Sequence, residues 1–441
     1  MKSFFKSIVA VVLEFLARAV LRKYKPKIVA VTGSVGKTTT KDAIYTVLAE
    51  NGRFVRKSEK SFNSEIGLPL TILGCANAWS NPFHWLVNFL KGLFLIIFRW
   101  TYPNILMLEI GADRPGDIER VTKWLKPNIA VLTRMGKVPV HVEYFSSPEA
   151  VRREKSFLAA AALSEKEGGK VVLNIDDPED AEFFKQYTDA TILTYGFSEK
   201  ADVRAGEKKI EYENSNLPNS RPIGISFILS AGGDHARVKV HGVLGRQPIY
   251  ACLAAAAVGK AMKIELKDIA KALSRHKTPP GRMRILKGRG GSILLDDTYN
   301  SSPVAAEEAL ETLREFSGTN RKIAVLGDML ELGDFYAAEH RALGDKLAIS
   351  GAVDLLITVG LRAKLIAESA SVAGLSPEKI FSFEDSFVAG EFLKREVRAG
   401  DIVLLKASQG IRLEKAVREI LEKPGDARKL LVRQESEWLN R

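Results

Sequence analysis

A glycine-rich segment near the start of the chain has the residue types that bind phosphate. Between a short apolar run at 28–31 and a predicted helix at 38–50 the chain reads Val31-Thr32-Gly33-Ser34-Val35-Gly36-Lys37-Thr38-Thr39-Thr40. Glycines let the backbone wrap around phosphate oxygens, and the N–H groups at a helix N-terminus attract anions. Lys37 would reach the terminal phosphates, and the Thr38 hydroxyl would ligate Mg²⁺. We therefore predict a nucleotide site at Gly33, Ser34, Val35, Gly36, Lys37, Thr38 and Thr39.

Three further residues could act on a nucleotide in this loop. Glu109 lies near the end of a predicted buried strand, where its carboxylate could hold a metal ion together with Thr38. A capping or salt-bridged carboxylate is the alternative for Glu109. His141 and Lys155 carry little weight alone, because a single histidine is more often structural and Lys155 lies in a run of charged residues.

These residues need a scaffold, and the hydrophobic pattern predicts one of alternating strands and helices. Buried strands are predicted by apolar runs at 28–31, 105–110, 129–132 and 171–174, and a second series by runs at 292–296, 322–326, 355–359 and 401–406. This alternation is typical of an α/β protein with mostly parallel sheets. We expect a central P-loop ATPase domain at 26–278 and a C-terminal Rossmann-like α/β domain at 279–441, joined near Pro279-Pro280.

The composition limits the function without choosing it. The 441 residues, 46% of them hydrophobic and 27% charged, are expected to form two or three globular domains. The net charge of +12 suits a nucleotide, an acidic precursor, nucleic acid or anionic lipid. Nucleic acid is the weakest of these, because the basic residues are dispersed and no aromatic-rich RNA motif accompanies them. Cys75 and Cys252 lack a metal-ligand spacing and are expected to be buried thiols.

Two apolar segments are unusual for a nucleotide-binding enzyme. Residues 1–25 predict an amphipathic helix with a wide apolar face, too short for the roughly 20 apolar residues that span a bilayer. Residues 78–102 form an apolar insertion with tryptophans of the kind found at membrane interfaces, Trp79, Trp85 and Trp100. Its polar positions lie near one helical stripe: His84, Asn88, Lys91 and Arg99. Packing on the protein itself is the alternative, but we expect both segments to contact a membrane surface.

Short motifs over almost the whole chain resemble those of the Mur ligase family. The phosphate loop is the short form that these enzymes carry, and the other matching segments are 62–71, Leu108-Glu109-Ile110-Gly111-Ala112, His141-Val142-Glu143 with Lys155, Asn174-Ile175-Asp176-Asp177, Gly281-Arg282-Met283 and Asp296-Asp297-Thr298-Tyr299-Asn300. The segment Gly327-Asp328-Met329-Leu330-Glu331-Leu332-Gly333 is similar to one in the branch that adds D-alanyl-D-alanine. The resemblance implies a ligase that joins a carboxylate to an amine through an acyl phosphate.

The resemblance also implies roles for single residues. His141 would be a ligand of a second Mg²⁺, and Lys155 would be the lysine that the family carbamylates, which turns a cation into an anionic oxygen ligand. Arg282 and Asp297 would contact ATP as the domains close and exclude water. The implied catalytic residues are Lys37, His141, Lys155 and Arg282. The implied metal ligands are Thr38, Glu109, His141 and Lys155, and Asn63 would contribute to the nucleotide site.

Three features depart from the family pattern. Pro248 and Ala251 stand where the family has asparagines that help hold adenine, and neither offers a side-chain amide. Ser302 and Gln409 stand where the family often has asparagine and arginine. Typical members have a UDP-sugar-binding domain before the phosphate loop, whereas here only the apolar helix precedes it. This third feature leads us to expect a lipid-linked precursor at a membrane surface as one form of the substrate.

The sequence as a whole predicts an ATP-dependent, ADP-forming ligase of cell-wall synthesis that uses ATP and Mg²⁺. The expected partners are a UDP-linked or lipid-linked precursor and D-alanyl-D-alanine or a similar amine. The expected location is the cytoplasm, with peripheral contact to the inner face of the membrane. Two alternatives stay open, a ligase of another branch and a non-catalytic nucleotide-binding scaffold. The intact phosphate and metal residues argue against the scaffold.

Overall fold

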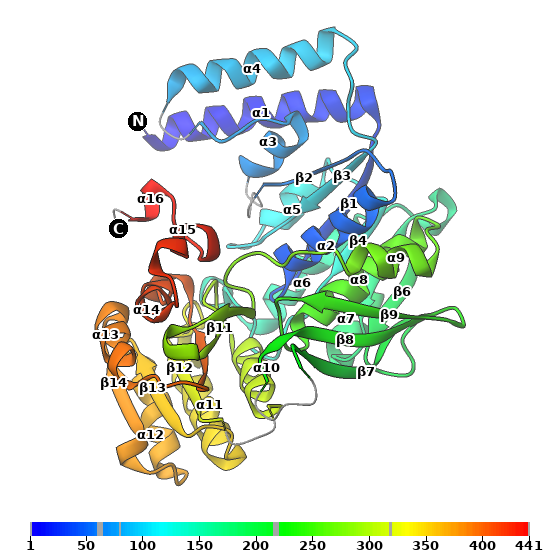
Figure 1. Cartoon of the computed structure of the whole chain (residues 1–441). Helices are drawn as coiled ribbons and strands as arrows, with labels where there is room; N and C mark the ends of the chain where they lie inside the picture. Colours follow the sequence, from blue (N-terminus) through cyan, green and yellow to red (C-terminus); the bar gives the residue numbers. More distant parts are fainter. Residues whose placement is uncertain (1, 60–64, 79–80, 215–219, 317–319, 440–441) are drawn as a thin grey trace.

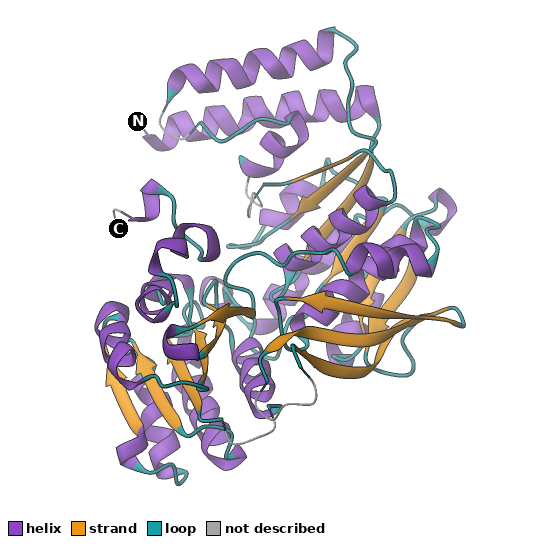
Figure 2. Cartoon of the chain, viewed as in Figure 1, coloured by secondary structure: helices purple, strands orange, loops and turns teal. Residues whose placement is uncertain are grey.

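The computed structural model describes residues 2–59, 65–78, 81–214, 220–316 and 320–439. These residues form two sheets with helices packed on them, and a separate layer of helices at one end (Figures 1 and 2). The predicted α/β class is confirmed. The predicted boundary at 278/279 falls between the last strand of the first sheet and the first strand of the second, and the domain division itself stays a prediction.

The first sheet has nine strands and is parallel except at one edge. Its order is β2 (Val55–Lys57), β3 (Ile105–Glu109), β1 (Lys27–Thr32), β4 (Ile129–Leu132), β5 (Lys170–Asn174), β6 (Thr191–Gly196), β7 (Val203–Tyr212), β8 (Pro222–Ala231) and β9 (Asp234–His241). Strands β7, β8 and β9 pair antiparallel. The central strands are buried along almost their whole length, which explains why they appear in the sequence as continuous apolar runs.

Two groups of helices pack on the first sheet. One group contains α2 (Lys37–Glu50), α8 (Gln247–Ala261) and α9 (Leu266–Leu273), and the other contains α5 (Asp117–Thr122), α6 (Pro148–Ala160) and α7 (Pro178–Lys185). Helix α8 is buried from Pro248 to Gly259, and its alanines allow α2 to approach closely. The first group therefore carries the phosphate loop, which leads into α2, on a firmly packed base.

The second sheet has six strands and is parallel except for its first strand. Its order is β10 (Arg284–Lys287), β11 (Ile293–Asp297), β15 (Ile402–Lys406), β12 (Lys322–Gly327), β13 (Leu355–Val359) and β14 (Ile380–Phe383). The helices of this half are α10 (Pro303–Arg314), α11 (Tyr336–Ser350), α12 (Lys364–Val372), α13 (Ser386–Glu396), α14 (Glu414–Ile420), α15 (Ala427–Leu430) and α16 (Ser436–Leu439). The predicted strands of both sheets are confirmed. The sequence analysis missed the short or less apolar strands β2, β6, β10 and β14, and it gave no bounds for β7, β8 and β9.

The two apolar segments pack against each other. Helix α1 (Lys2–Tyr24) lies between α4 (Pro82–Ile97) and the short α3 (Gly67–Leu73) (Figure 1). We call α1 and α4 the helix pair. The inner side of α1 is fully buried at Val9, Leu13, Leu16, Ala17 and Val20.

The helix pair corrects part of the sequence interpretation. One side of each segment packs on the protein itself, as in the alternative, and contact of the other side with a membrane stays a prediction. Trp85 is only 5% exposed, so its interfacial role was wrong, and Asn88 is buried with its amide donating to the Ala76 carbonyl at 2.9 Å. Trp79 lies outside the described residues. Among the described helices, none has the length and apolarity needed to cross a membrane.

Candidate active site

The phosphate loop lies at a switch point of the first sheet. Strand β1 pairs in parallel with β3 on one side and β4 on the other, so that Val31 is level with Glu109 and Thr32 with Leu132. The chain leaves the carboxyl end of β1 through Gly33 to Gly36 and enters α2 at Lys37. In open α/β sheets, ligands bind outside the carboxyl ends of the strands at such a point. The fold therefore places the predicted loop where a nucleotide is expected.

Two glycines of the loop have conformations that other residues would strain to adopt. Gly33 has φ of 143°, and a Cβ there would lie 2.0 Å from the Thr133 hydroxyl oxygen. Gly36, with φ of 83°, is the N-cap of α2. Both positions require glycine, because the backbone passes close to the neighbouring strand and then turns directly into the helix.

Lys37 folds back over the loop. Its ammonium donates to the Gly33 carbonyl at 2.8 Å and to the Ser34 carbonyl at 3.5 Å. Burial lowers the pKa of Lys37, and the nearby Glu109 opposes this shift. A half-buried cation whose hydrogen bonds go to neutral carbonyls can move to an anion that binds it more strongly. The terminal phosphates of a nucleotide would be such an anion.

Thr38 and Glu109 are in contact, and their role as a metal-binding pair stays a prediction. The Thr38 hydroxyl donates to Glu109 Oε1 at 3.2 Å. Glu109 Oε2 lies 3.7 Å from the ammonium of Lys41, and both side chains are almost fully buried. Within the described residues this oxygen accepts no hydrogen bond. A buried carboxylate oxygen without a hydrogen bond, next to a hydroxyl, is a donor set that Mg²⁺ accepts.

Lys155 lies beneath the loop, not on a solvated face. It belongs to α6, is completely buried, and donates to the Gly33 carbonyl at 3.1 Å. Burial lowers its pKa well below the usual value, and the neighbouring cation Lys37 adds to this effect. The alternative of an exposed charge in the 152–155 run is therefore wrong for this residue.

His141 faces carboxylates from both halves of the chain. Its Nδ1 lies 2.8 Å from Glu331 Oε2, in the loop after β12, and its Nε2 lies 3.8 Å from Asp113 Oδ1. His141 and Glu331 both have positive φ, 73° and 64°. The close contact with His141 lowers the pKa of Glu331. The described residues hold no group of three or more His, Cys, Asp and Glu side chains arranged around one metal position.

The second sheet contributes cations and a carboxylate. Asp297 and Lys406 are level on the neighbouring strands β11 and β15 and form an ion pair. Asp297 also accepts from the Met283 amide at 3.1 Å. The Arg282 guanidinium stacks on Tyr299, 3.9 Å from the ring centre, and its buried Nε donates to no described residue. Tyr299 therefore holds the Arg282 guanidinium in place, while its Nε–H has no acceptor among the described residues.

These groups line one cavity of about 260 Å³ between the two halves. The first half contributes the loop and its surroundings, and the second half contributes the ends of its strands. The lining residues include Ser34, Val35, Gly36, Lys37, Thr38, Thr39, Glu109, Asp113, His141, Gln247, Pro248, Arg282, Asp297, Asn300, Ser302, Lys406 and Gln409. The predicted residues Gly33 and Lys155 do not line this cavity, and Asn63 lies outside the described residues.

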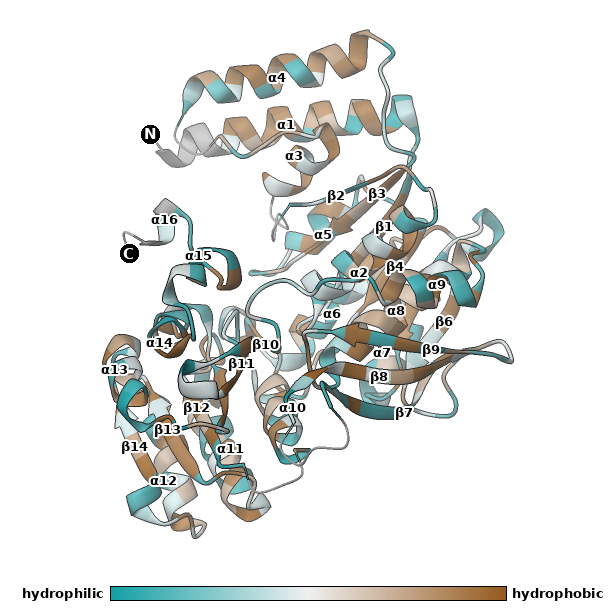
Figure 3. Ribbon diagram, viewed as in Figure 1, coloured by the Kyte–Doolittle hydropathy of each residue, from teal (hydrophilic) through white to brown (hydrophobic). Residues whose placement is uncertain are grey.

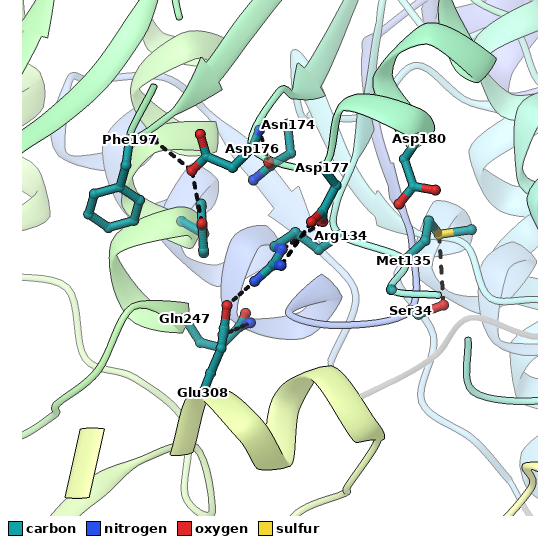
Figure 4. Close-up of polar contacts among 12 residues, drawn as sticks. Ser34, Arg134, Met135, Asn174, Asp176, Asp177, Asp180, Phe197, Gln247 and Glu308 are labelled. Atoms are coloured by element: carbon teal, nitrogen blue, oxygen red, sulfur yellow. Dashed lines mark hydrogen bonds and ion pairs between the residues drawn. The ribbon is translucent and has the colours of Figure 1, made fainter. Parts of the chain in front are cut away.

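A second polar network joins the halves beside the loop (Figure 4). Arg134 donates to Asp177 from Nε at 2.7 Å and from Nη2 at 2.9 Å. It also contacts Glu308 on α10, and Glu308 in turn accepts from Gln247 at the start of α8. Sequence reasoning missed Glu308, Asp113 and the contact made by Glu331. Only Asp177 and Glu331 lay within quoted motifs, and nothing local marked Glu308.

The geometry defines an ATP-using enzyme in which the cavity is completed by a second α/β half, and known proteins share this design. The model of the Mur ligase middle domain matches residues 31–83 and 92–259, and that of the Mur ligase glutamate ligase domain matches 281–409. The UDP-N-acetylmuramoyl-tripeptide–D-alanyl-D-alanine ligase of Bacillus subtilis is 28% identical, over 93% of this chain and 79% of that protein. The Mycobacterium leprae enzyme of the same name is 30% identical, over 88% and 72%.

Solved structures agree with these matches. The MurF ligase from Thermotoga maritima, in complex with ADP, superposes with a TM-score of 0.74 at 27% identity, over 96% of this chain and 84% of that one. A pseudomurein peptide ligase type C from Methanothermus fervidus shares the fold at 19% identity, with a TM-score of 0.62 over 90% and 79%. The chain belongs to the Mur ligase family. It is an ATP-dependent, ADP-forming ligase.

Proposed function

We propose that this ligase joins D-alanyl-D-alanine to the peptide carboxylate of UDP-N-acetylmuramoyl-tripeptide. The cavity shared by the phosphate loop and the second sheet is the observation that carries this proposal. The names of the curated relatives supply the substrates. ATP and a UDP-linked precursor are metabolites of the cytoplasm, which is therefore the proposed location.

The first step activates the carboxylate. A carboxylate oxygen of the tripeptide attacks the γ-phosphorus of ATP, the bond to the β-phosphate oxygen breaks, and an acyl phosphate and ADP form. Lys37 and the N-terminus of α2 would neutralise charge on the phosphates. Arg282 lines the cavity and would contact the transferred group or the nucleotide from the other side.

The second step forms the amide bond. The amine of D-alanyl-D-alanine attacks the acyl carbon, phosphate leaves, and the amine loses a proton. Water competes with the amine for the acyl phosphate, so a closed cavity favours the product. The contacts of His141 with Glu331 and of Arg134 with Glu308 would hold the two halves together over the cavity.

Metal binding is proposed for residues of the first half. Thr38 and Glu109 fit Mg²⁺, and His141 and Lys155 would belong to a second site if Lys155 is carbamylated. Carbamylation requires a neutral amine that attacks CO₂, and burial beside Lys37 favours the neutral form of Lys155. Bound Mg²⁺ would withdraw charge from the phosphate oxygens. A ¹³C NMR signal from protein incubated with ¹³C-bicarbonate, lost in Lys155→Ala, would report the carbamate.

A lipid-linked precursor is the second candidate substrate, and the exposed apolar side chains of the helix pair favour it. A panel assay separates the candidates. Phosphate release from ATP would be measured with D-alanyl-D-alanine or single amino acids, each with UDP-linked or lipid-linked precursor. We expect the highest rate with D-alanyl-D-alanine and the UDP-linked tripeptide. Release with no pair, while ATP still binds, would contradict the ligase function and favour the scaffold.

A further inference from the structure

The outer side of the helix pair is apolar where a globular protein is normally polar. Seven large apolar side chains of α4 are exposed and recur every three or four residues, so they lie on one side of the helix. We call them the outer stripe: Phe83, Leu86, Val87, Leu90, Leu93, Phe94 and Ile97. Figure 3 shows α4 as a largely hydrophobic helix at the edge of the molecule, beyond α1. Nothing in the described chain covers this side.

The outer stripe is not the side of α4 that packs on the protein. The opposite side of α4 is already buried against its neighbours at Trp85, Asn88, Gly92 and Leu95. A Cβ at Gly92 would lie 2.8 Å from Leu16 Cδ1, so the two helices touch closely. Lys23 of α1 donates to the carbonyls of Leu95 at 2.9 Å and Ile96 at 2.8 Å and thereby ties down the end of α4. The stripe therefore points outward from a helix that is fixed in place.

The charge of the helix pair selects the kind of partner. The segments 1–25 and 78–102 contain eight lysines and arginines but only one acidic residue, Glu14. Arg22 and Arg99 are exposed, and Arg99 lies two residues beyond the end of α4. A second copy of this chain would bring the same cations against each other, which is unfavourable. An anionic lipid surface would offer both apolar acyl chains for the outer stripe and negative headgroups for the cations.

The length and ends of α4 indicate how it would lie. Its 16 residues correspond to about 24 Å at ~1.5 Å per residue, and its apolar side chains follow one side only. Trp100, 62% exposed, lies just beyond the helix end, where an interfacial tryptophan would reach the headgroup level. We propose that α4 lies in the plane of an anionic membrane surface, with the outer stripe buried among acyl chains and Arg22 and Arg99 near the phosphates.

This docking surface goes beyond the proposed ligase function and is separate from the cavity. None of the outer-stripe residues lines the cavity. The loop, Arg282 and Asp297 are carried by the sheets, whereas the stripe is carried by the helix pair. A variant can therefore lose lipid binding without losing amide formation, or the reverse. The two are connected only through location, since docking would hold the ligase near a lipid-linked precursor.

A flotation experiment with the full chain tests the proposal. Vesicles of phosphatidylglycerol and phosphatidylcholine in equal parts would be compared with vesicles of phosphatidylcholine alone. We expect the wild type to float with the anionic vesicles and more weakly with the neutral ones. Leu90→Gln, Phe94→Gln and Ile97→Gln combined should lower the partition coefficient by about a hundredfold or more, because three large apolar side chains no longer favour burial.

Matched variants make the result specific. A control with Ile349→Gln, Leu361→Gln and Val372→Gln removes three apolar side chains of the second half that are even more exposed, and it should float like the wild type. Arg22→Gln with Arg99→Gln should weaken binding to anionic vesicles only, and added salt should do the same.

Three outcomes would overturn the proposal. The first is a wild type that stays in solution with both kinds of vesicle. The second is a stripe variant that floats like the wild type. The third is a wild-type dimer, seen by light scattering, that the stripe variant converts to a monomer, because a second copy would then cover the stripe. Phosphate release would be measured on the same samples. Retained flotation with no ligase activity would count against the proposed function alone.

Discussion

Proteins usually bury apolar side chains and expose charged ones. The cavity and the helix pair depart from this in opposite ways. The cavity region buries ionisable groups, with Lys41, Glu109 and Lys155 inside the protein and Lys37 half-buried at the cavity wall. The helix pair exposes large apolar groups, with Phe83 69% and Ile97 66% accessible. Single exposed apolar residues are ordinary, but a continuous apolar stripe or a cluster of buried charges usually marks a functional site.

The two regions differ in how far other residues of the chain offset the free-energy cost of burying charge or exposing apolar side chains. Buried charge in the cavity is partly offset inside the molecule: Glu109 lies near Lys41, and Lys37 and Lys155 donate to the loop carbonyls. The region keeps an excess of positive charge, which a bound polyphosphate would neutralise. The outer stripe has no such internal partner within the described residues. The cavity therefore predicts a ligand that binds inside it, and the outer stripe predicts a partner surface that covers it.

The largest effect is expected from Lys37→Ala. Loss of this cation removes the charge that meets the terminal phosphates, so phosphate release should fall by about a thousandfold or more. Lys126→Ala removes an exposed lysine of the same half and should leave the rate unchanged. Ligase activity that survives in a folded Lys37→Ala protein would show that the buried charge of the cavity serves another purpose.

Glu109→Gln should have the next largest effect. The amide keeps the shape but removes the anion beside Thr38 and Lys41, so turnover should fall by about a hundredfold. Half-saturation by Mg²⁺ should move to higher concentration. The free energy of unfolding should fall by about 1–3 kcal/mol, because Lys41 loses the closer of its two neighbouring carboxylates. An unchanged Mg²⁺ dependence would remove Glu109 from the metal site.

Glu308→Gln tests the contact that joins the halves. Arg134 keeps Asp177 in this variant but loses its charged partner on α10. We expect the KM for ATP to rise by about tenfold, with a smaller change in kcat, because closure over the nucleotide becomes less favourable. The control is Glu311→Gln on the same helix, whose carboxylate pairs with Arg314 at 2.8 Å. A lower thermal stability with an unchanged KM would make Glu308 a purely structural residue.

Gly92→Val tests the inner side of the helix pair. The added side chain would press on Leu16 and should lower the free energy of unfolding by about 1–3 kcal/mol. Ligase activity at low temperature should be unaffected, since Gly92 is far in the fold from the cavity lining. The double variant with Leu16→Ala should be less destabilised than the sum of the two single variants. Strict additivity would show that the helices do not touch there.

Leu90→Gln should have the smallest effect on the isolated protein. Its side chain is already 55% exposed, so the free energy of unfolding should change by less than about 0.5 kcal/mol in chemical denaturation. The variant sharpens the comparison, because the same side chain should matter for flotation. A loss of several kcal/mol would mean that the outer stripe supports the fold.

Much of this molecule could be predicted from local patterns. The central strands are buried on both faces, so continuous apolar runs such as that of β1 identified them. The loop was recognisable because phosphate binding needs Gly33, Gly36, Lys37 and Thr38 at fixed spacing. Short or half-exposed strands such as β14 lack this signal, since no residue of β14 is fully buried and it forms no continuous buried run.

The rest depends on contacts between distant residues. Arg134 and Glu308 are 174 positions apart, and nothing near either residue predicts the other. Lys155 appeared to lie in a charged surface run until the packing of α6 placed it beneath the loop. Trp85 and Trp100 belong to one apolar segment, yet one is buried and the other exposed. Sequence periodicity shows that a helix has two sides but not which side the protein covers.

The tie between Lys23 and the end of α4 also affects how the chain emerges from the ribosome. Lys23 and Leu95 are 72 positions apart, so α1 is synthesised long before the helix that covers it. At about 5–20 residues per second, this interval lasts roughly 4–15 s. During that time the nascent chain carries an uncovered apolar helix with basic ends. A chaperone or a nearby membrane would meet α1 before α4 does.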